Sequence, residues 1–121
     1  MKNLEIIRAR NALQAATGEQ RFERSDVNGL PALVQSCGLL ATAAYVSTGQ
    51  EARRGMRAAF DAVATHLRDL DVAILLERPQ GGNESPTDLL IRELTRRDST
   101  ALVAATAETQ AYLSYLKRFA R

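Results

Sequence analysis

Apolar residues recur every three or four positions along most of the chain, which is the spacing of one face of an α-helix. No stretch alternates apolar and polar residues for long enough to indicate a half-buried strand. The spacing predicts helices at about Asn3–Ala16, Leu30–Ser47, Glu51–Leu70 and Thr100–Ala120, and a short one that begins near Pro86 or Thr87. The chain is therefore expected to be helical almost throughout.

Four stretches between these helices are less regular. The polar stretch Glu19–Gly29 is expected to be a loop or a frayed turn, and Thr48-Gly49 to break the chain. The apolar run Val72–Leu76 has no strand partner elsewhere, so we expect it to end the helix before it. The glycine- and proline-rich segment Arg78–Pro86 is the clearest loop.

The helix at Leu30–Ser47 is apolar on most of its sides, which is typical of a central, buried helix. Cys37 lies within its main apolar stripe and is expected to be a small core residue rather than a nucleophile. In the last helix, Leu116 and Phe119 are expected to be buried against this second helix. The third helix has one apolar face, formed by Met56, Phe60, Val63, Leu67 and Leu70.

These elements predict an all-α fold, a compact bundle of five or six helices in a single domain over residues 1–121. Apolar residues make up 45% of the chain and charged residues 25%, which excludes a disordered or collagen-like chain. No apolar run approaches the roughly 18 residues of a membrane span. One cysteine cannot form an internal disulfide, which fits a cytoplasmic protein.

The sequence offers little catalytic chemistry. With one histidine and one cysteine, a histidine-paired nucleophile or a zinc cluster lacks its residues, and we expect no enzyme activity, cofactor or metal. His66 is expected to be a packed or surface histidine rather than an acid–base catalyst. Glu108, at the edge of the last helix's apolar stripe, is expected to pair with an arginine from a neighbouring helix.

Basic residues give the only candidate binding surface. Arginine is far commoner than lysine, and arginine is the better phosphate ligand. The first choice for phosphate contacts is one helix face carrying Arg54 and Arg57, flanked by Arg53 and Arg68, and the second choice is Lys117 with Arg118. A solvated face with an Arg57–Asp61 pair explains the first cluster equally well. Residues 69–91 hold one basic and five acidic residues.

Two blocks of the chain resemble a known family. In Leu30–Tyr45, a Leu-Pro pair is followed by an apolar run into Cys37-Gly38-Leu39. In Ala105–Ala120, a Thr-x-Glu motif precedes Tyr-Leu-Lys-Arg-Phe-Ala. Both blocks resemble the small, all-helical subunit of the Cmr-type (type III-B) CRISPR RNA-guided effector. The chain departs from that pattern at Cys37, where asparagine is common, and at Tyr115, where tryptophan is usual.

The resemblance implies a subunit without a catalytic role in antiviral defence. It implies that copies of the chain stack in an inner filament beside the backbone and large subunits of the effector, and help to hold guide RNA and target RNA. Basic faces suit that role because phosphate contacts carry no sequence information. The net-acidic segment would offer charge complementarity for head-to-tail packing. The alternative is a helical adaptor or phage-type regulatory protein that acts as a dimer and binds only protein.

Overall fold

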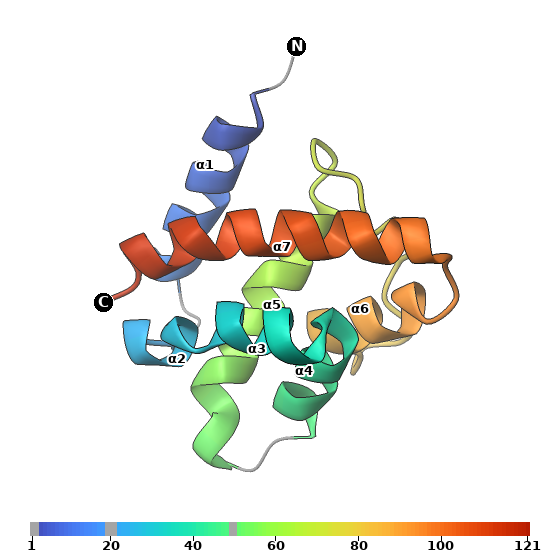
Figure 1. Cartoon of the computed structure of the whole chain (residues 1–121), viewed down its shortest axis with the longest axis horizontal. Coiled ribbons are helices and arrows are strands. Elements are labelled where there is room, and N and C mark those ends of the chain that lie inside the picture. Colours follow the sequence, from blue (N-terminus) through green and yellow to red (C-terminus); the bar gives the residue numbers. More distant parts are fainter. Residues whose placement is uncertain (1–2, 19–21, 49–50) are drawn as a thin grey trace.

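The computed structural model describes residues 3–18, 22–48 and 51–121. These residues form seven α-helices and one 3-10 turn, and they contain no strand, so the all-α prediction is confirmed (Figure 1). The helices are α1 Leu4–Thr17, α2 Arg24–Asn28, α3 Leu30–Cys37, α4 Leu39–Ser47, α5 Arg54–Arg68, α6 Pro86–Leu94 and α7 Ser99–Phe119, and the 3-10 turn η1 is Glu51–Arg53.

Helix starts follow local capping chemistry. Asn3 accepts hydrogen bonds from the main-chain N–H groups of residues 5 and 6, Ser85 accepts one from Asp88, and Asp98 accepts one from Ala101. A side-chain oxygen at the N-cap satisfies main-chain donors that have no partner inside the helix. These caps explain why the starts of α1, α6 and α7 lie within a residue or two of the predicted ones.

The central helix is α5, rather than the predicted helix at Leu30–Ser47. It runs behind the long helix α7 and packs against α1, α2, α4, α6 and α7 (Figure 1). Its fully buried residues are Ala59, Phe60, Ala62, Val63, Ala64, His66 and Leu67. α7 supplies the facing surface with Ala105, Tyr112, Leu113 and Leu116. Small alanines on α5 allow the surrounding helices to approach it closely.

The predicted helix at Leu30–Ser47 is divided in two at Gly38. This glycine has a φ of 96°, which only glycine adopts without strain, and its N–H donates to the carbonyl of Val34. The chain changes direction at Gly38, which interrupts the helical register. The apolar residues before and after this break therefore do not form one continuous stripe on a single helix face. Cys37 is exposed, and the prediction that it is a core residue is wrong.

The run Val72–Leu76 is not the end of a helix, because α5 ends at Arg68 and Asp69 is its C-cap. The chain turns there, and the N–H groups of Ile74 and Leu75 both donate to the carbonyl of Leu67. Leu75 is buried in the core, whereas Leu70 is 90% exposed and does not belong to the apolar face of the third helix. Because the chain turns here, Leu70 leaves the apolar face on which helical periodicity placed it.

Ala73 occupies the left-handed region of backbone conformation, with a φ of 55°. A side chain at such a position costs about 1 kcal/mol, because Cβ approaches the neighbouring carbonyl. We expect Ala73→Gly to raise the free energy of unfolding by about 0.5 kcal/mol after the entropy of the unfolded glycine is counted. Urea denaturation would measure it. The same change at the exposed helical residue Ala104 should instead lower stability by about 1 kcal/mol, and a loss at both positions would contradict this strain.

The segment Glu19–Gly29, which the sequence predicts to be a loop, contains the short helix α2. Residues 19–21 of this segment lie outside the described residues, as does Gly49 of the predicted break at Thr48-Gly49. Glu23 and Asp26 form a reciprocal capping box around the start of α2. Gly55 of α5 lies against Asp26 so closely that a Cβ there would overlap the carboxylate. This close approach depends on two residues far apart in sequence, which local periodicity cannot detect.

The last helix is only partly as predicted. Leu116 is fully buried, but Phe119 is 38% exposed, so its expected burial against the second helix is wrong. Helix α7 ends at this residue, and Ala120 turns into the core beside the start of α2, where Arg24 N–H donates to the carbonyl of Arg121 at 2.6 Å. The residues after the phenylalanine, rather than its ring, close this end of the bundle.

Candidate nucleic-acid interface

The six basic residues singled out from the sequence lie in three separate places. Arg53, Arg54 and Arg57 lie at the N-terminal end of α5, and Arg68 is the last residue of the same helix. Arg68 is eleven positions after Arg57, which is about 16 Å along a helix. Lys117 and Arg118 lie in the last turn of α7. The structure therefore offers alternative surfaces rather than one continuous basic face.

Arg53 is already engaged within the protein. Its guanidinium lies 4.2 Å from the centre of the Tyr45 ring, and its Nη1 donates to the Tyr45 carbonyl at 2.7 Å. Cation–π stacking and the hydrogen bond together fix the side chain against α4. Tyr45 is 46% exposed, so this pair lies at the protein surface.

Arg54 and Arg57 have acidic neighbours. Arg54 forms an ion pair with Glu51, and both side chains are largely exposed. Arg57 lines a groove of about 450 Å³ between α4, α5 and α6, together with Asp61 and Asp88. Within the described part of the chain, Asp61 forms no ion pair with Arg57 and instead accepts hydrogen bonds from the N–H and hydroxyl of Thr87. The carboxylates reduce the positive potential of this surface.

Arg57 nevertheless retains hydrogen-bonding capacity. Its Nε is covered from solvent and has no hydrogen-bond partner among the described residues. A buried donor without an acceptor is uncommon in folded proteins. Arg68 is half-buried and, together with Leu70, lines two grooves of about 600 and 270 Å³.

Of the three places that hold these basic residues, the end of α7 is the one with cations and no acidic neighbour among the described residues of its groove. A groove of about 510 Å³ is lined by Arg24, Ser114, Lys117 and Arg118. Arg24 is held in place because its Nε donates to the Ala120 carbonyl at 3.1 Å and its Nη2 to the Arg118 carbonyl at 3.5 Å. Lys117 and Arg118 are exposed beside it. Three cations thus line this groove, and none of the described residues that line it carries a carboxylate.

Arg24 was missed by reasoning from the sequence. The residue belongs to a segment predicted to be a loop, 93 positions before Lys117. Only the packing of α2 against the C-terminus of α7 brings it there. One signal in the local sequence could have indicated that a helix begins here. It is the Glu23-x-x-Asp26 spacing, which departs from the usual Ser/Thr-x-x-Glu capping box.

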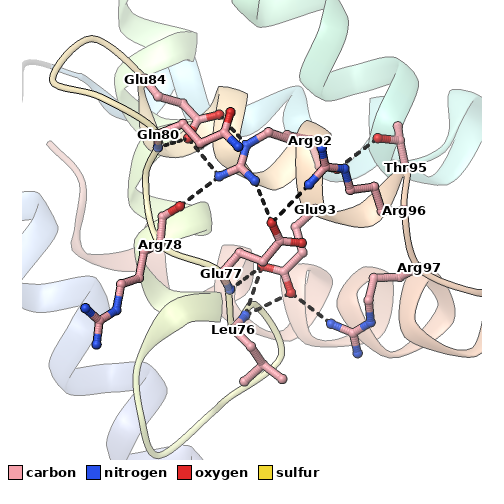
Figure 2. Close-up of polar contacts among 10 residues, drawn as sticks. All are labelled: Leu76, Glu77, Arg78, Gln80, Glu84, Arg92, Glu93, Thr95, Arg96 and Arg97. Atoms are coloured by element: carbon pink, nitrogen blue, oxygen red, sulfur yellow. Dashed lines mark hydrogen bonds and ion pairs between the residues drawn. The ribbon is translucent and has the colours of Figure 1, made fainter.

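The acidic segment 69–91 is largely neutralised inside the protein. Figure 2 shows Arg92 between two carboxylates, with Nε at 2.7 Å from Glu84 and Nη1 at 2.5 Å from Glu77. The hydrogen bond from Arg92, together with one from the Gln80 N–H, lowers the pKa of Glu84 to about 2. Arg10 lies within 4 Å of carboxylate oxygens of Asp69 and Asp71. These pairs weaken the case for an acidic patch that drives head-to-tail packing.

A second polar cluster lies beneath α1. Arg8 makes a two-pronged ion pair with Glu108, with both N···O distances 2.7 Å, and His66 Nε2 lies 2.8 Å from the same carboxylate. The prediction that Glu108 pairs with an arginine from another helix is confirmed, and His66 is packed in the core. Burial opposes ionisation of Glu108, but the hydrogen bonds from Arg8 and His66 outweigh it, so the pKa of Glu108 lies below its ordinary value.

The described residues contain no group of histidine, cysteine, aspartate and glutamate arranged to hold a metal ion. None of the helices in the described part of the chain has the length and apolar character of a membrane span.

These features define a small helical protein whose basic side chains line several surface grooves, and the groove at the end of α7 is lined by cations without a carboxylate among the described residues. The family model of the CRISPR-associated protein Cas_Cmr5 matches residues 5–121, which is almost the whole chain. The chain belongs to this family and is a subunit of the Cmr-type (type III-B) CRISPR system. Neither a curated protein nor a solved structure shows a significant match to the chain.

Proposed function

We propose that this chain is a non-catalytic structural subunit of the type III-B effector that holds guide and target RNA through its basic surface. The groove lined by Arg24, Lys117 and Arg118 carries this proposal, because three cations gather there. Such a groove attracts phosphates of any sequence. Membership of the Cas_Cmr5 family supports a place in a multi-subunit complex. The partners are further copies of the chain and the backbone and large subunits.

We further propose that copies of the chain stack on one another, and apolar side chains left in solvent support this stacking. Ile6 and Leu13 lie seven residues apart on the outer side of α1, and Val103 is exposed on α7. Leu70 and Leu76 are also exposed, near Arg68. Packing of neighbouring subunits against these residues would remove their apolar surface from water. Because much of the acidic segment is paired internally, apolar contacts are a better candidate than charge for the subunit interface.

The groove at the end of α7 is tested by paired charge reversals. We expect Lys117→Glu with Arg118→Glu to weaken target RNA binding by the assembled effector about equally for unrelated guide–target pairs. The log–log salt dependence should become shallower by about one unit for each phosphate that the variant no longer binds. Affinity is measured against salt concentration in complexes of verified equal composition.

The matched comparison is Arg54→Glu with Arg57→Glu, which changes the charge by the same amount at the other candidate surface. A loss confined to this second pair would move the RNA contact to the N-terminal end of α5. Unchanged affinity and slope in both double variants would overturn the RNA-holding role. A complex that loses this subunit in either variant would place that surface at a protein contact instead.

A further inference from the structure

Helix α1 is held to the bundle by a set of polar contacts as well as by a small apolar face. Of its 14 residues, only Ile7 and Ala12 are fully buried, while Ile6 and Leu13 face solvent. Its hydrogen bonds and ion pairs, by contrast, reach both neighbouring helices. They run from Arg8 to Glu108, from Asn11 to His66 and Asp69, from Arg10 to Asp69 and Asp71, and from the Tyr112 hydroxyl to the Asn11 carbonyl.

The single histidine lies at the centre of these contacts, and its surroundings fix its protonation. His66 Nε2 faces the Glu108 carboxylate, which can only accept, so Nε2 carries a hydrogen. Asn11 Nδ2 lies 2.9 Å from both His66 Nδ1 and Asp69 Oδ2. Because the Asp69 carboxylate also only accepts, it holds the Asn11 amide with its NH2 group toward His66. His66 Nδ1 must therefore be a bare acceptor.

The groups that face His66 come from three elements. Arg8 and Asn11 belong to α1, Glu108 and Tyr112 to α7, and Asp69 caps α5 itself. The Tyr112 ring stacks on the imidazole with 4.2 Å between centres. Burial lowers the pKa of His66 below its ordinary 6.5, although Glu108 and Asp69 oppose the shift. Both the hydrogen-bond geometry and the lowered pKa indicate that the His66 ring is neutral.

We propose that His66 is a pH-sensitive latch for α1. With His66 neutral, Asn11 donates to it and α1 stays docked on α5 and α7. A proton added to Nδ1 places an N–H opposite the Asn11 NH2 group, and the amide cannot rotate without turning its oxygen toward Asp69. The proton has a route from solvent, because His66, Asn11 and Asp69 line a surface groove of about 600 Å³. This inference goes beyond the proposed function and is tested on the isolated chain.

The direction of the pH effect follows from linkage. A base whose pKa is lower in the docked state binds fewer protons there than after release. Docking is therefore strongest above pH 6.5 and weakens as the pH falls below it, by about tenfold for each pH unit between the two pKa values. Glu108 and Asp69 remain ionised between pH 7.5 and 5.5, because their pKa values lie below the ordinary 4.5 and 3.8. His66 is therefore the member of this cluster that takes up a proton as the pH falls below 6.5.

The test uses the isolated chain labelled with ¹⁵N, in which one histidine gives one set of ring signals. We expect the neutral ring to carry its hydrogen on Nε2 and to titrate below pH 6.5. Amides of α1 should lose protection against hydrogen exchange by at least several-fold between pH 7.5 and 5.5, after correction for intrinsic rates. Amides in the first half of α7 serve as the internal reference. A ring that titrates at or above 6.5, or α1 protection that stays constant through the titration, would overturn the latch.

Two variants and a control make the test independent of any one substitution. His66→Gln should abolish the loss of α1 protection below pH 6.5. Asn11→Asp should reverse it, because a carboxylate accepts from a protonated His66 and is repelled by Asp69 at higher pH. Glu5→Gln changes an exposed carboxylate on the same helix and should leave the wild-type response. If Asn11→Asp kept the wild-type direction, or Glu5→Gln removed the response, the Asn11–His66 contact would not be the cause.

Discussion

Replacement of Glu108 with alanine is expected to lower the free energy of unfolding by about 3 kcal/mol. The change leaves His66, whose side chain is fully buried, without its acceptor, and Arg8, which is about three-quarters buried, without its counter-ion. Removal of one partner of a buried ion pair typically costs about 3–5 kcal/mol, and the lower end applies here because Arg8 retains some contact with water. Urea denaturation at pH 7.5 measures the loss.

Two comparisons separate the charge from the packing at Glu108. Glu108→Gln keeps the shape and one acceptor oxygen, so it should cost less than the alanine variant. Arg10→Ala removes a side chain of α1 that is about half exposed and whose ion pairs are long, at 3.6 and 3.9 Å, so its cost should stay below about 1 kcal/mol. Equal losses of unfolding free energy for Glu108→Ala and Arg10→Ala would contradict the prediction that the Glu108 ion pair stabilises the fold as a buried pair does.

The second large effect is expected at Glu93. Its carboxylate, 1% exposed, accepts the main-chain N–H groups of Leu76 and Glu77 at 2.9 Å and Arg97 Nη1 at 2.8 Å (Figure 2). We expect Glu93→Ala to lower the free energy of unfolding by about 2–4 kcal/mol, because the two main-chain donors lose their acceptor where the chain turns back into the core. Amides at 74–77 should also lose protection against hydrogen exchange before the rest of the chain.

Glu77→Gln is the matched control for Glu93, since it changes a carboxylate in the same cluster. Glu77 is about one-third exposed and pairs with Arg92 and Arg96 at the surface, so its replacement should cost less than about 1 kcal/mol. A Glu93→Ala variant as stable as Glu77→Gln would mean that the turn is held by the burial of Leu75 and not by the carboxylate.

Much of the architecture could be predicted from the sequence because it depends on local chemistry. The apolar period of 3.6 residues locates the helices, and Asn3, Ser85 and Asp98 locate three of their starts. The same reasoning fails at Gly38 and at Val72–Leu76. A single φ of 96° redirects one helix, and a buried carboxylate 17 residues away holds the other segment in a turn. Gly38 lies within the predicted helix but leaves its apolar period unchanged, and Glu93 lies outside the window in which the period around Val72–Leu76 is measured.

The candidate site divides in the same way. Lys117 and Arg118 could be identified from the sequence, because exposed cations in the last turn of a helix face solvent whatever the helix packs against. Arg24 could not be identified, because its position depends on the contact of α2 with the end of α7. Asp88, which reduces the positive charge around Arg54 and Arg57, also comes close only in the folded chain, whereas Asp61 is four residues from Arg57 on the same helix.

The order of residues was enough to establish the helical class, the family and the pairing of Glu108 with an arginine, because these depend on periodicity, on motifs and on the cost of an unpaired buried charge. Three further properties emerged only from the folded chain: the internal pairing of the acidic segment, the exposure of Cys37 and Phe119, and the set of cations that share a groove. Electrostatic and packing energies depend on distances in space. Residues such as Arg24 and Lys117, or Arg8 and Glu108, acquire such a distance only when the helices dock.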